Sequence, residues 1–181
     1  MSTAMSRFGT AEVSVVDDTA FKIVRRFDAP ASLVFEVWTT PEYVRRWWTD
    51  ESNPLTECTI DLRVGGGWRY ALEGPDGTAL AWHGIYQEIV KGSRLVSTEV
   101  FEPFPDAEAL NTLTLTEEAG LTTLTALVRH KTKDARDGHL QAGMETGLQL
   151  ALDRVERLLT WSRCVEPAEA GSASASTDRR R

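Results

Sequence analysis

The sequence predicts an α+β fold in which an antiparallel sheet wraps a long C-terminal helix. Residues 134–161 repeat apolar side chains every three or four positions, as one face of a helix does. From residue 55 onward, six shorter runs alternate apolar and polar side chains and are separated by short turn signals. Consecutive strands with short connections favour an antiparallel meander, and one long helix after them gives the α+β class.

Length and composition indicate a single globular domain. The chain has 181 residues, of which 41% are hydrophobic and 26% charged, as is usual for soluble proteins. We expect residues 20–161 to form this domain. Residues 1–19 are an N-terminal extension whose partial order stays open, and residues 162–181 are a disordered tail, rich in Gly, Ser and Ala, with a basic end.

Charge and motif content exclude several classes of function. The net charge of −7 argues against nucleic acid as a partner, because such binding needs clustered positive charge. There is no apolar run long enough to span a membrane and no secretory signal at the start, so we expect a cytoplasmic protein without a membrane partner. Two distant cysteines and three scattered histidines predict no disulfide, no metal and no cofactor.

The N-terminal part of the domain is predicted to form a strand and two short helices. Residues 21–27 alternate as a strand does, and the run ends at Pro30, which opens a helix. A break at Thr40-Pro41 separates that helix from a second one over residues 42–48. The apolar positions with helical spacing in the first helix are Leu33, Val34, Val37 and Trp38.

Trp47 and Trp48 close the second short helix. Adjacent helical side chains point about 100° apart, so one indole can enter the core while the other covers an edge or the mouth of a cavity. In the alternative interpretation both indoles seal the helix pair against the sheet. The sequence leaves both interpretations open.

Six strands are predicted after residue 55, with turns between them. Pro75-Asp76-Gly77 has the chemistry of a turn. Gly65-Gly66-Gly67 lacks the spacing of a phosphate-binding loop and leads into a strand, so we interpret it as a turn or bulge. The predicted strands cover residues 58–62, 68–72, 80–90, 95–101, 110–116 and 121–130.

The predicted C-terminal helix contains two glycines, Gly143 and Gly147, one turn apart. Each costs about 1 kcal/mol relative to alanine in a helix interior. Either the helix approaches the sheet closely there, or space is left for a ligand beside Met144 and Leu148, and spacing alone does not decide. Asp134 or Asp137 is expected to cap the start. The apolar stripe consists of Leu140, Met144, Leu148, Leu152, Val155 and Leu159.

Short motifs follow one another in a fixed order over residues 20–161. They are Arg26-Phe27-Asp28-Ala29-Pro30, Val34-Phe35, Val37-Trp38, Pro41-Glu42, Arg46-Trp47-Trp48, Gly65-Gly66, Trp68-Arg69-Tyr70, Asp76-Gly77, His83-Gly84-Ile85-Tyr86, Arg94-Leu95-Val96 and Gly143-Met144-Glu145-Thr146-Gly147. This series resembles the START-like (SRPBCC) superfamily, and within it the branch named after the C-terminal domain of the activator of the heat-shock chaperone ATPase. The resemblance implies a helix-grip fold, in which a curved antiparallel sheet holds the C-terminal helix and an apolar cavity lies between them.

The resemblance leads to ligand binding as the first functional hypothesis. We expect the cavity to take a small apolar or amphipathic molecule. Many members of the branch carry Trp at the position of Leu148, so a larger or differently shaped cavity is expected here. The candidate lining residues are Trp48, Cys58, Trp68, Tyr70, Trp82, Tyr86, Phe101, Met144 and Leu148.

Two other hypotheses remain. Relatives implied by the resemblance include cyclases and lyase-type enzymes, for which His83 and Glu99 are the weak catalytic candidates because both lie mid-strand. The two-residue period places His83 on the face opposite Trp82 and Tyr86. Alternatively, the chain is a co-chaperone-like or regulatory interaction module. Such a module would stimulate the ATPase of its partner, and its acidic surface could meet a basic surface of that partner. Whether it is a monomer or a homodimer stays open.

Overall fold

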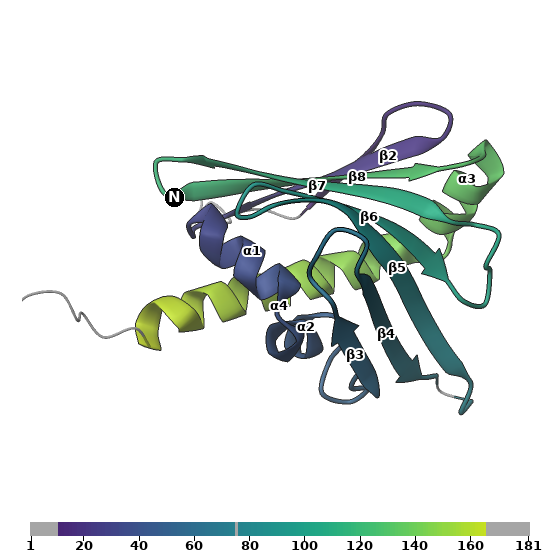
Figure 1. The fold of residues 1–181 in the computed structure, drawn as a ribbon, viewed down its shortest axis with the longest axis horizontal. Helices are drawn as coiled ribbons and strands as arrows, with labels where there is room; N and C mark the ends of the chain where they lie inside the picture. The colour runs from purple at the N-terminus through teal and green to yellow at the C-terminus, as the bar shows by residue number, and fades with distance from the viewer. Residues whose placement is uncertain (1–10, 75, 166–181) are drawn as a thin grey trace, which may run out of the picture.

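The structure, a computed structural model, describes residues 11–74 and 76–165. In this part of the chain eight strands form one antiparallel sheet in the order β1-β2-β8-β7-β6-β5-β4-β3, and α4 crosses its concave face (Figure 1). The predicted α+β class and helix-grip fold are confirmed. The elements are β1 (Glu12–Val15), β2 (Ala20–Phe27), α1 (Ala31–Thr39), α2 (Pro41–Trp47), β3 (Glu57–Ile60), β4 (Gly67–Glu73), β5 (Ala79–Val90), β6 (Arg94–Phe101), β7 (Ala109–Glu118), β8 (Leu121–His130), α3 (Lys133–Gln141) and α4 (Met144–Val165).

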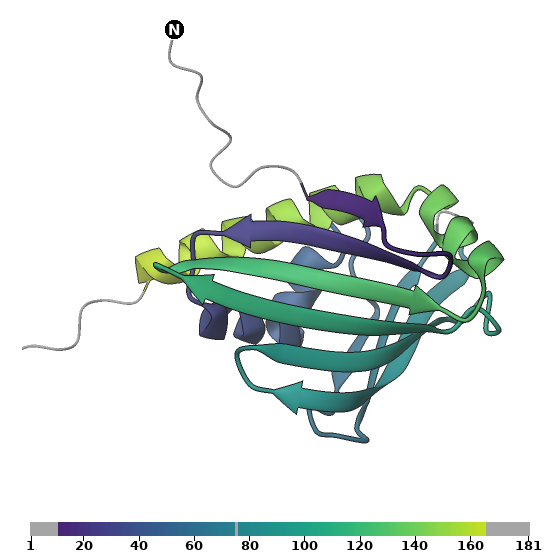
Figure 2. The ribbon, with the colours of Figure 1, turned by 90° about the horizontal axis from the view of Figure 1, so that it is seen from above.

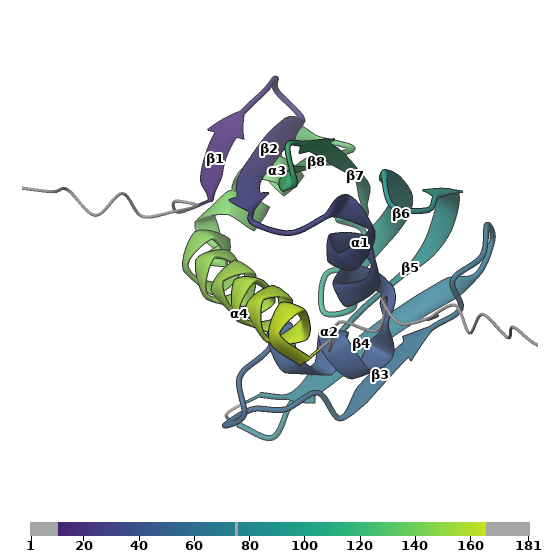
Figure 3. The ribbon, with the colours of Figure 1, turned by 90° about the vertical axis from the view of Figure 1, so that its left-hand side faces the viewer.

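The sheet is curved, and its strands follow the chain except at one place. Strands β3 to β8 form the predicted meander, each paired with the next. The exception is β2, which comes early in the sequence and pairs with β8 along its whole length. Seen along α4, the sheet bends around the helix, and α1 and α2 lie on the same side as α4 (Figure 3). Seen from above, α4 runs beneath the sheet (Figure 2). The concave face is therefore the covered one.

One strand was not predicted. Strand β1 pairs with β2 at an edge of the sheet, with Val13 opposite Ile23. Three of its four residues are exposed, so the strand has little of the buried and exposed alternation from which strands are recognised. As a result, the two short helices follow the second strand rather than the first.

The prediction of one continuous helix over residues 134–161 was wrong. The segment forms two helices, α3 and α4, which are separated at Gly143. Gly143 has a φ of +76°, a left-handed conformation that glycine adopts without the steric cost of a Cβ. The start of α3 also differs from expectation, because Thr132 is the cap: its hydroxyl accepts a hydrogen bond of 3.2 Å from the backbone N–H of Ala135.

The two short helices are packed together by Trp47. Its indole is buried and donates a hydrogen bond of 2.9 Å from Nε1 to the carbonyl oxygen of Val37 in α1. Trp48 is only half-buried and faces the space between helix and sheet. The first interpretation of this pair is thus the correct one: one indole enters the core and the other borders a cavity.

Helix α4 is fixed in the fold mainly from Ala151 onward. Arg25 of β2 is 3% exposed and donates hydrogen bonds to Asp153 at 2.8 Å and to Glu156 at 2.6 Å. Leu152 and Val155 are fully buried on the same stretch. Toward the start of α4 the side chains are only half-buried or exposed up to Gln149. The first two turns of α4 are therefore less closely packed than the rest of the helix.

Candidate functional site

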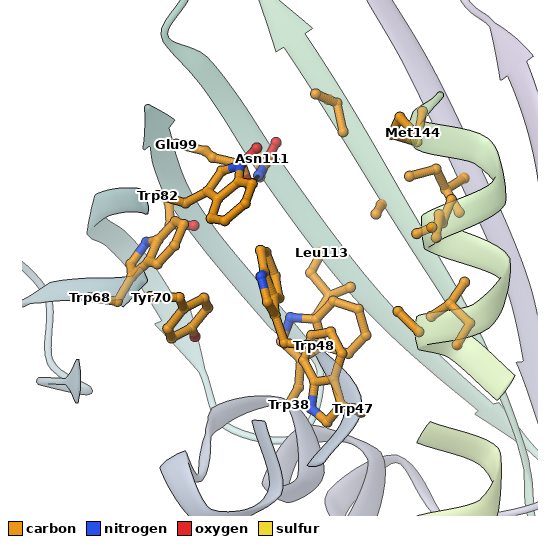
Figure 4. A pocket seen from close by; sticks show the side chains of 18 of the residues that line it. Trp38, Trp47, Trp48, Trp68, Tyr70, Trp82, Glu99, Asn111, Leu113 and Met144 are labelled. Atoms are coloured by element: carbon orange, nitrogen blue, oxygen red, sulfur yellow. Dashed lines mark hydrogen bonds between the residues drawn. The ribbon is translucent and has the colours of Figure 1, made fainter. Parts of the chain in front are cut away.

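A cavity of about 400 Å³ lies under the N-terminal half of α4. Its walls come from the concave face of the sheet, from α1 and α2, and from α3 and α4 (Figure 4). Strand register builds the sheet wall, because residues paired across adjacent strands point to the same face. One row consists of Tyr86, Ser97, Asn111, Val128 and Phe21, and a second of Leu95, Leu113, Ala126 and Ile23.

Aromatic rings form one side of the cavity. Five of the six tryptophans line it, from α1, from α2 and its C-terminal end, and from strands β4 and β5. Trp48 connects the helical and the sheet contributions, since its ring centroid lies 4.9 Å from that of Tyr70 and 5.9 Å from that of Trp82. Trp68 continues this wall, 4.8 Å from Tyr70. The wall offers several indole faces to whatever occupies the space.

A small polar cluster lies among these apolar walls. Asn111 of β7 donates a hydrogen bond of 2.8 Å from Nδ2 to Oε2 of Glu99 on β6 (Figure 4). Burial raises the pKa of Glu99 above its ordinary value, because the charged form loses hydration. Within the described residues, the Oδ1 atom of Asn111 is buried and has no hydrogen-bond partner. Ser97 of β6 is paired directly with Asn111, two residues before Glu99, and also lines the cavity.

Two tyrosines add hydroxyl groups to the lining. Tyr70 and Tyr86 are buried, and each side chain influences the ionisation of the other. Burial raises the pKa of both, so both phenols keep their protons at neutral pH. They are therefore neutral hydrogen-bonding groups in an otherwise apolar wall.

The helix side of the cavity includes Gly147, one of the two glycines of this region. Met144, Gly147 and Leu148 line the space. A Cβ atom built at Gly147 or at Gly143 would meet no atom within 4 Å. Close approach of the helix to the sheet, the first interpretation of these glycines, is therefore wrong for both. The second interpretation, space for a ligand, agrees with Gly147, which lines the cavity, but not with Gly143, which does not.

Seven of the nine candidate binding residues line the cavity, and two do not. Those in the lining are Trp48, Trp68, Tyr70, Trp82, Tyr86, Met144 and Leu148. The Cys58 Sγ atom instead lies 3.8 Å from the carbonyl oxygen of Pro41, and burial raises the pKa of this thiol to about 11. The Phe101 ring stacks on Trp82 at 4.9 Å between centroids and is not itself part of the lining. For Cys58 and Phe101, the expected placement in the lining was wrong.

The two catalytic candidates lie on opposite faces of the sheet. His83 is on the outer face, where its Nδ1 atom is 3.0 Å from Oε1 of Glu102. Glu102 also accepts hydrogen bonds from Arg69, and these bonds, with that to His83, lower its pKa to about 2. Glu99 lines the cavity. The structure therefore does not bring His83 and Glu99 together in one site.

Some lining residues were not among the candidates. Asn111 could have been found, because it shares the two-residue period of Leu113 and Leu115, which point inward. His139 could not, since its place depends on a contact with His130, whose Nε2 is 3.0 Å from its Nδ1. Burial, and then the neighbouring His130, lower the pKa of His139 to about 4, so it is neutral at pH 7.

The described part of the chain lacks a metal-binding cluster and a membrane-spanning helix. Among residues 11–74 and 76–165, no three or more His, Cys, Asp or Glu side chains gather in a way that could hold a metal ion. The helices in the same ranges include none with the length and apolar character needed to cross a membrane.

Comparison with known proteins places the chain in a family. The family model described as "Activator of Hsp90 ATPase homolog 1-like protein" matches residues 28–160. A search of curated proteins found no match. A solved structure from Rhodobacter sphaeroides is similar at 25% identity and a TM-score of 0.76, over 86% of this chain and 99% of that one.

Two further solved structures have the same fold. A protein from Mycobacterium smegmatis shows 25% identity and a TM-score of 0.74, over 83% of this chain and 97% of that one. A protein from Arthrobacter aurescens shows 25% identity and a TM-score of 0.73, over 94% and 100%. With its helix-grip architecture and the family match over residues 28–160, the chain belongs to the activator of Hsp90 ATPase homolog 1-like family of the START-like superfamily.

Proposed function

We propose that the protein binds a small apolar or amphipathic molecule in the cavity between the sheet and the N-terminal half of α4. The observation that carries the proposal is the cavity itself: about 400 Å³ bordered mainly by aromatic and aliphatic side chains, with a few polar groups in one place. Sites for small molecules are typically concave and mostly apolar, with a small number of polar groups that fix orientation.

The way in which the space is maintained supports a binding role. Protein interiors seldom contain voids much larger than a water molecule, because unfilled apolar space forfeits dispersion contacts. Here Gly147 and Leu148 stand at the positions of α4 where larger side chains would reduce the space. A bound molecule would recover the missing contacts with the indoles and with Leu148.

A dye-binding experiment tests this function. The neutral apolar dye N-phenyl-1-naphthylamine should bind saturably, with one molecule per chain and with enhanced emission. Leu148→Trp should weaken this binding at least tenfold, because the indole would occupy part of the cavity. The same substitution at Leu150, which is 51% exposed on α4, is the matched control and should leave binding unchanged.

Unfolding measurements on the same variants give a second readout. If the space is free, Leu148→Trp should raise the midpoint of thermal unfolding. A loss of about 1–3 kcal/mol, the usual cost of overpacking, would mean that the site is already filled by the protein. That loss, or dye binding that is equal in the Leu148 and Leu150 variants, would contradict the proposal.

A second candidate function is stimulation of a heat-shock chaperone ATPase. The observation that favours it is the family match, since the family is named after an activator of the Hsp90 ATPase. The test is the rate of ATP hydrolysis by a purified Hsp90-type chaperone with and without the chain. Stimulation that saturates with added chain supports the candidate, and an unchanged rate at excess chain rejects it.

A further inference from the structure

Within the described chain, the polar cluster in the cavity contains an acidic side chain but no positively charged partner for it. Glu99 is an acid in the lining, and burial opposes its ionisation unless a compensating group is near. Of the residues that the structure describes, those that line the cavity include no lysine or arginine. His139 is in the lining but stays neutral at pH 7. The protein itself therefore supplies no positive charge to this carboxylate from within the cavity.

The cluster also has more acceptors than donors. The Nδ2 atom of Asn111 is already hydrogen-bonded to Glu99, and this bond identifies Oδ1 as the other end of the amide. Oδ1 is buried and has no hydrogen-bond partner in the described chain. A carboxylate accepts hydrogen bonds and donates none. A ligand that completes this cluster must therefore bring donors.

Aromatic rings line the same cavity as the acceptors. Trp82 stacks on Phe101, which is two residues from Glu99 on the same face of β6. Trp82, Glu99 and Asn111 line the same cavity, and in the view of Figure 4 they are drawn at one end of it. The face of an indole attracts a cation through its quadrupole, and this attraction is strongest where water is excluded. Both the carboxylate of Glu99 and the indole rings of the cavity therefore favour a positively charged group.

We propose that the cavity selects amphipathic molecules whose polar end is a protonated amine. The ammonium group donates hydrogen bonds to Glu99 and to Oδ1 of Asn111, and the apolar body lies along the wall formed by Trp48, Trp82 and Tyr70. This inference rests on the proposed binding function and adds the chemical class of the ligand. A molecule with a carboxylate head would meet Glu99 with a like charge and should be rejected.

Three compounds with one ring system test the selection. 1-Naphthylmethylamine, 1-naphthalenemethanol and 1-naphthylacetic acid share a naphthyl body and carry a cationic, a neutral and an anionic head at pH 7.5. Calorimetric titration of the unmodified chain should show the amine bound at least tenfold more tightly than the alcohol, and the acid most weakly. This comparison needs no variant, so it holds whether or not a substitution disturbs folding.

A charge-neutral variant then assigns the effect to one residue. Glu99→Gln keeps the shape of the side chain and should weaken amine binding at least tenfold, while the alcohol binds within threefold of its original affinity. The retained alcohol binding shows that the cavity is intact. Glu88→Gln is the matched control, because Glu88 is an exposed glutamate of β5 that pairs with Arg94. It should change neither affinity.

The outcomes separate this inference from the function on which it rests. Equal affinities for the amine and the alcohol would overturn the amine preference and leave cavity binding standing. An amine preference that persists in Glu99→Gln would overturn the role of Glu99 and with it the inference. If none of the three compounds binds and the neutral dye does not bind either, both proposals fail.

Discussion

His139 is the residue in the cavity wall whose protonation has the clearest consequence for stability. It packs edge-on against Phe21 with ring centroids 5.2 Å apart, and its Nδ1 lies 3.0 Å from Nε2 of His130. Burial lowers the pKa of His139 to about 4, and burial also lowers that of His130. A histidine with a depressed pKa binds its proton more readily when the chain is unfolded.

We therefore expect the free energy of unfolding to fall as the pH decreases from about 6.5 to about 4. Relative to pH 7, protonation of His139 should lower the free energy of unfolding at pH 5 by about 1 to 2 kcal/mol, given the difference between its folded and ordinary pKa values. His139→Gln can keep a hydrogen bond to His130 but does not titrate. Urea unfolding at pH 7 and pH 5 should show a smaller decrease for this variant than for the unmodified chain.

Comparison with the variant removes the effect of other groups. Carboxylates that titrate near pH 4 or 5 are common to both chains and cancel in the difference. Equal decreases in the two chains would show that His139 does not carry the pH dependence.

The candidate site could be predicted from the sequence in part, and the individual residues show why. The two-residue period predicted that Trp82 and Tyr86 share one face of β5, and both line the cavity, but the period does not say which of the two faces points inward. Cys58 and Phe101 were misplaced because the same period does not say where along a strand the cavity ends. The Glu99–Asn111 contact depends on the pairing of β6 with β7, which the period of either strand alone does not give.

At the scale of elements, the boundary between α3 and α4 is the main difference from the prediction. A helical apolar period continues through Gly143, so the pattern alone indicates one helix. The break requires a positive φ, which a glycine permits but does not require. The strands of the meander were predicted because alternation and turn chemistry agree at each boundary, whereas β1 has too few buried residues to show alternation.

The two glycines of this region should respond to alanine in opposite directions. Gly147→Ala should raise the free energy of unfolding by up to about 1 kcal/mol, because the site is helical and a Cβ would meet no atom within 4 Å. Gly143→Ala should lower it by about 1 to 2 kcal/mol, because φ is +76° there.

Chemical unfolding of the two single variants measures both effects, and each serves as the control for the other because the side chain added is the same. Stabilisation by Gly143→Ala would mean that α3 and α4 join into one helix when the glycine is removed. Destabilisation by Gly147→Ala would mean that the space beside α4 is smaller than described.

At the scale of the whole molecule, the cavity exists because the sheet and α4 are held together at one end more than at the other. Arg25 and the buried Leu152 and Val155 fix α4 from Leu152 onward, while Gly147 and Leu148 line the cavity. The order of motifs predicted the fold, but the sequence did not give the distance between helix and sheet. Unfilled volume depends on that distance, which many contacts determine together.

The Arg25 contacts should contribute measurably to overall stability. Arg25→Met removes two charge-assisted hydrogen bonds, and we expect a loss of about 1 to 3 kcal/mol in the free energy of unfolding. The loss is limited because Asp153 and Glu156 are partly exposed and water can solvate them. Lys22→Met, at an exposed position of the same strand, is the control and should cost less than about 0.5 kcal/mol. Equal losses in the two variants would show that Arg25 does not hold the helix.

The indoles around the cavity also give the molecule an optical property. Trp38, Trp47, Trp48 and Trp82 form a continuous series, with successive ring centroids 4.6, 5.5 and 5.9 Å apart. Transition dipoles of neighbouring indoles at such separations couple as excitons. The near-ultraviolet circular dichroism of the protein is therefore a collective signal of the cavity wall, and an occupant that turns any one ring changes the spectrum of the whole series.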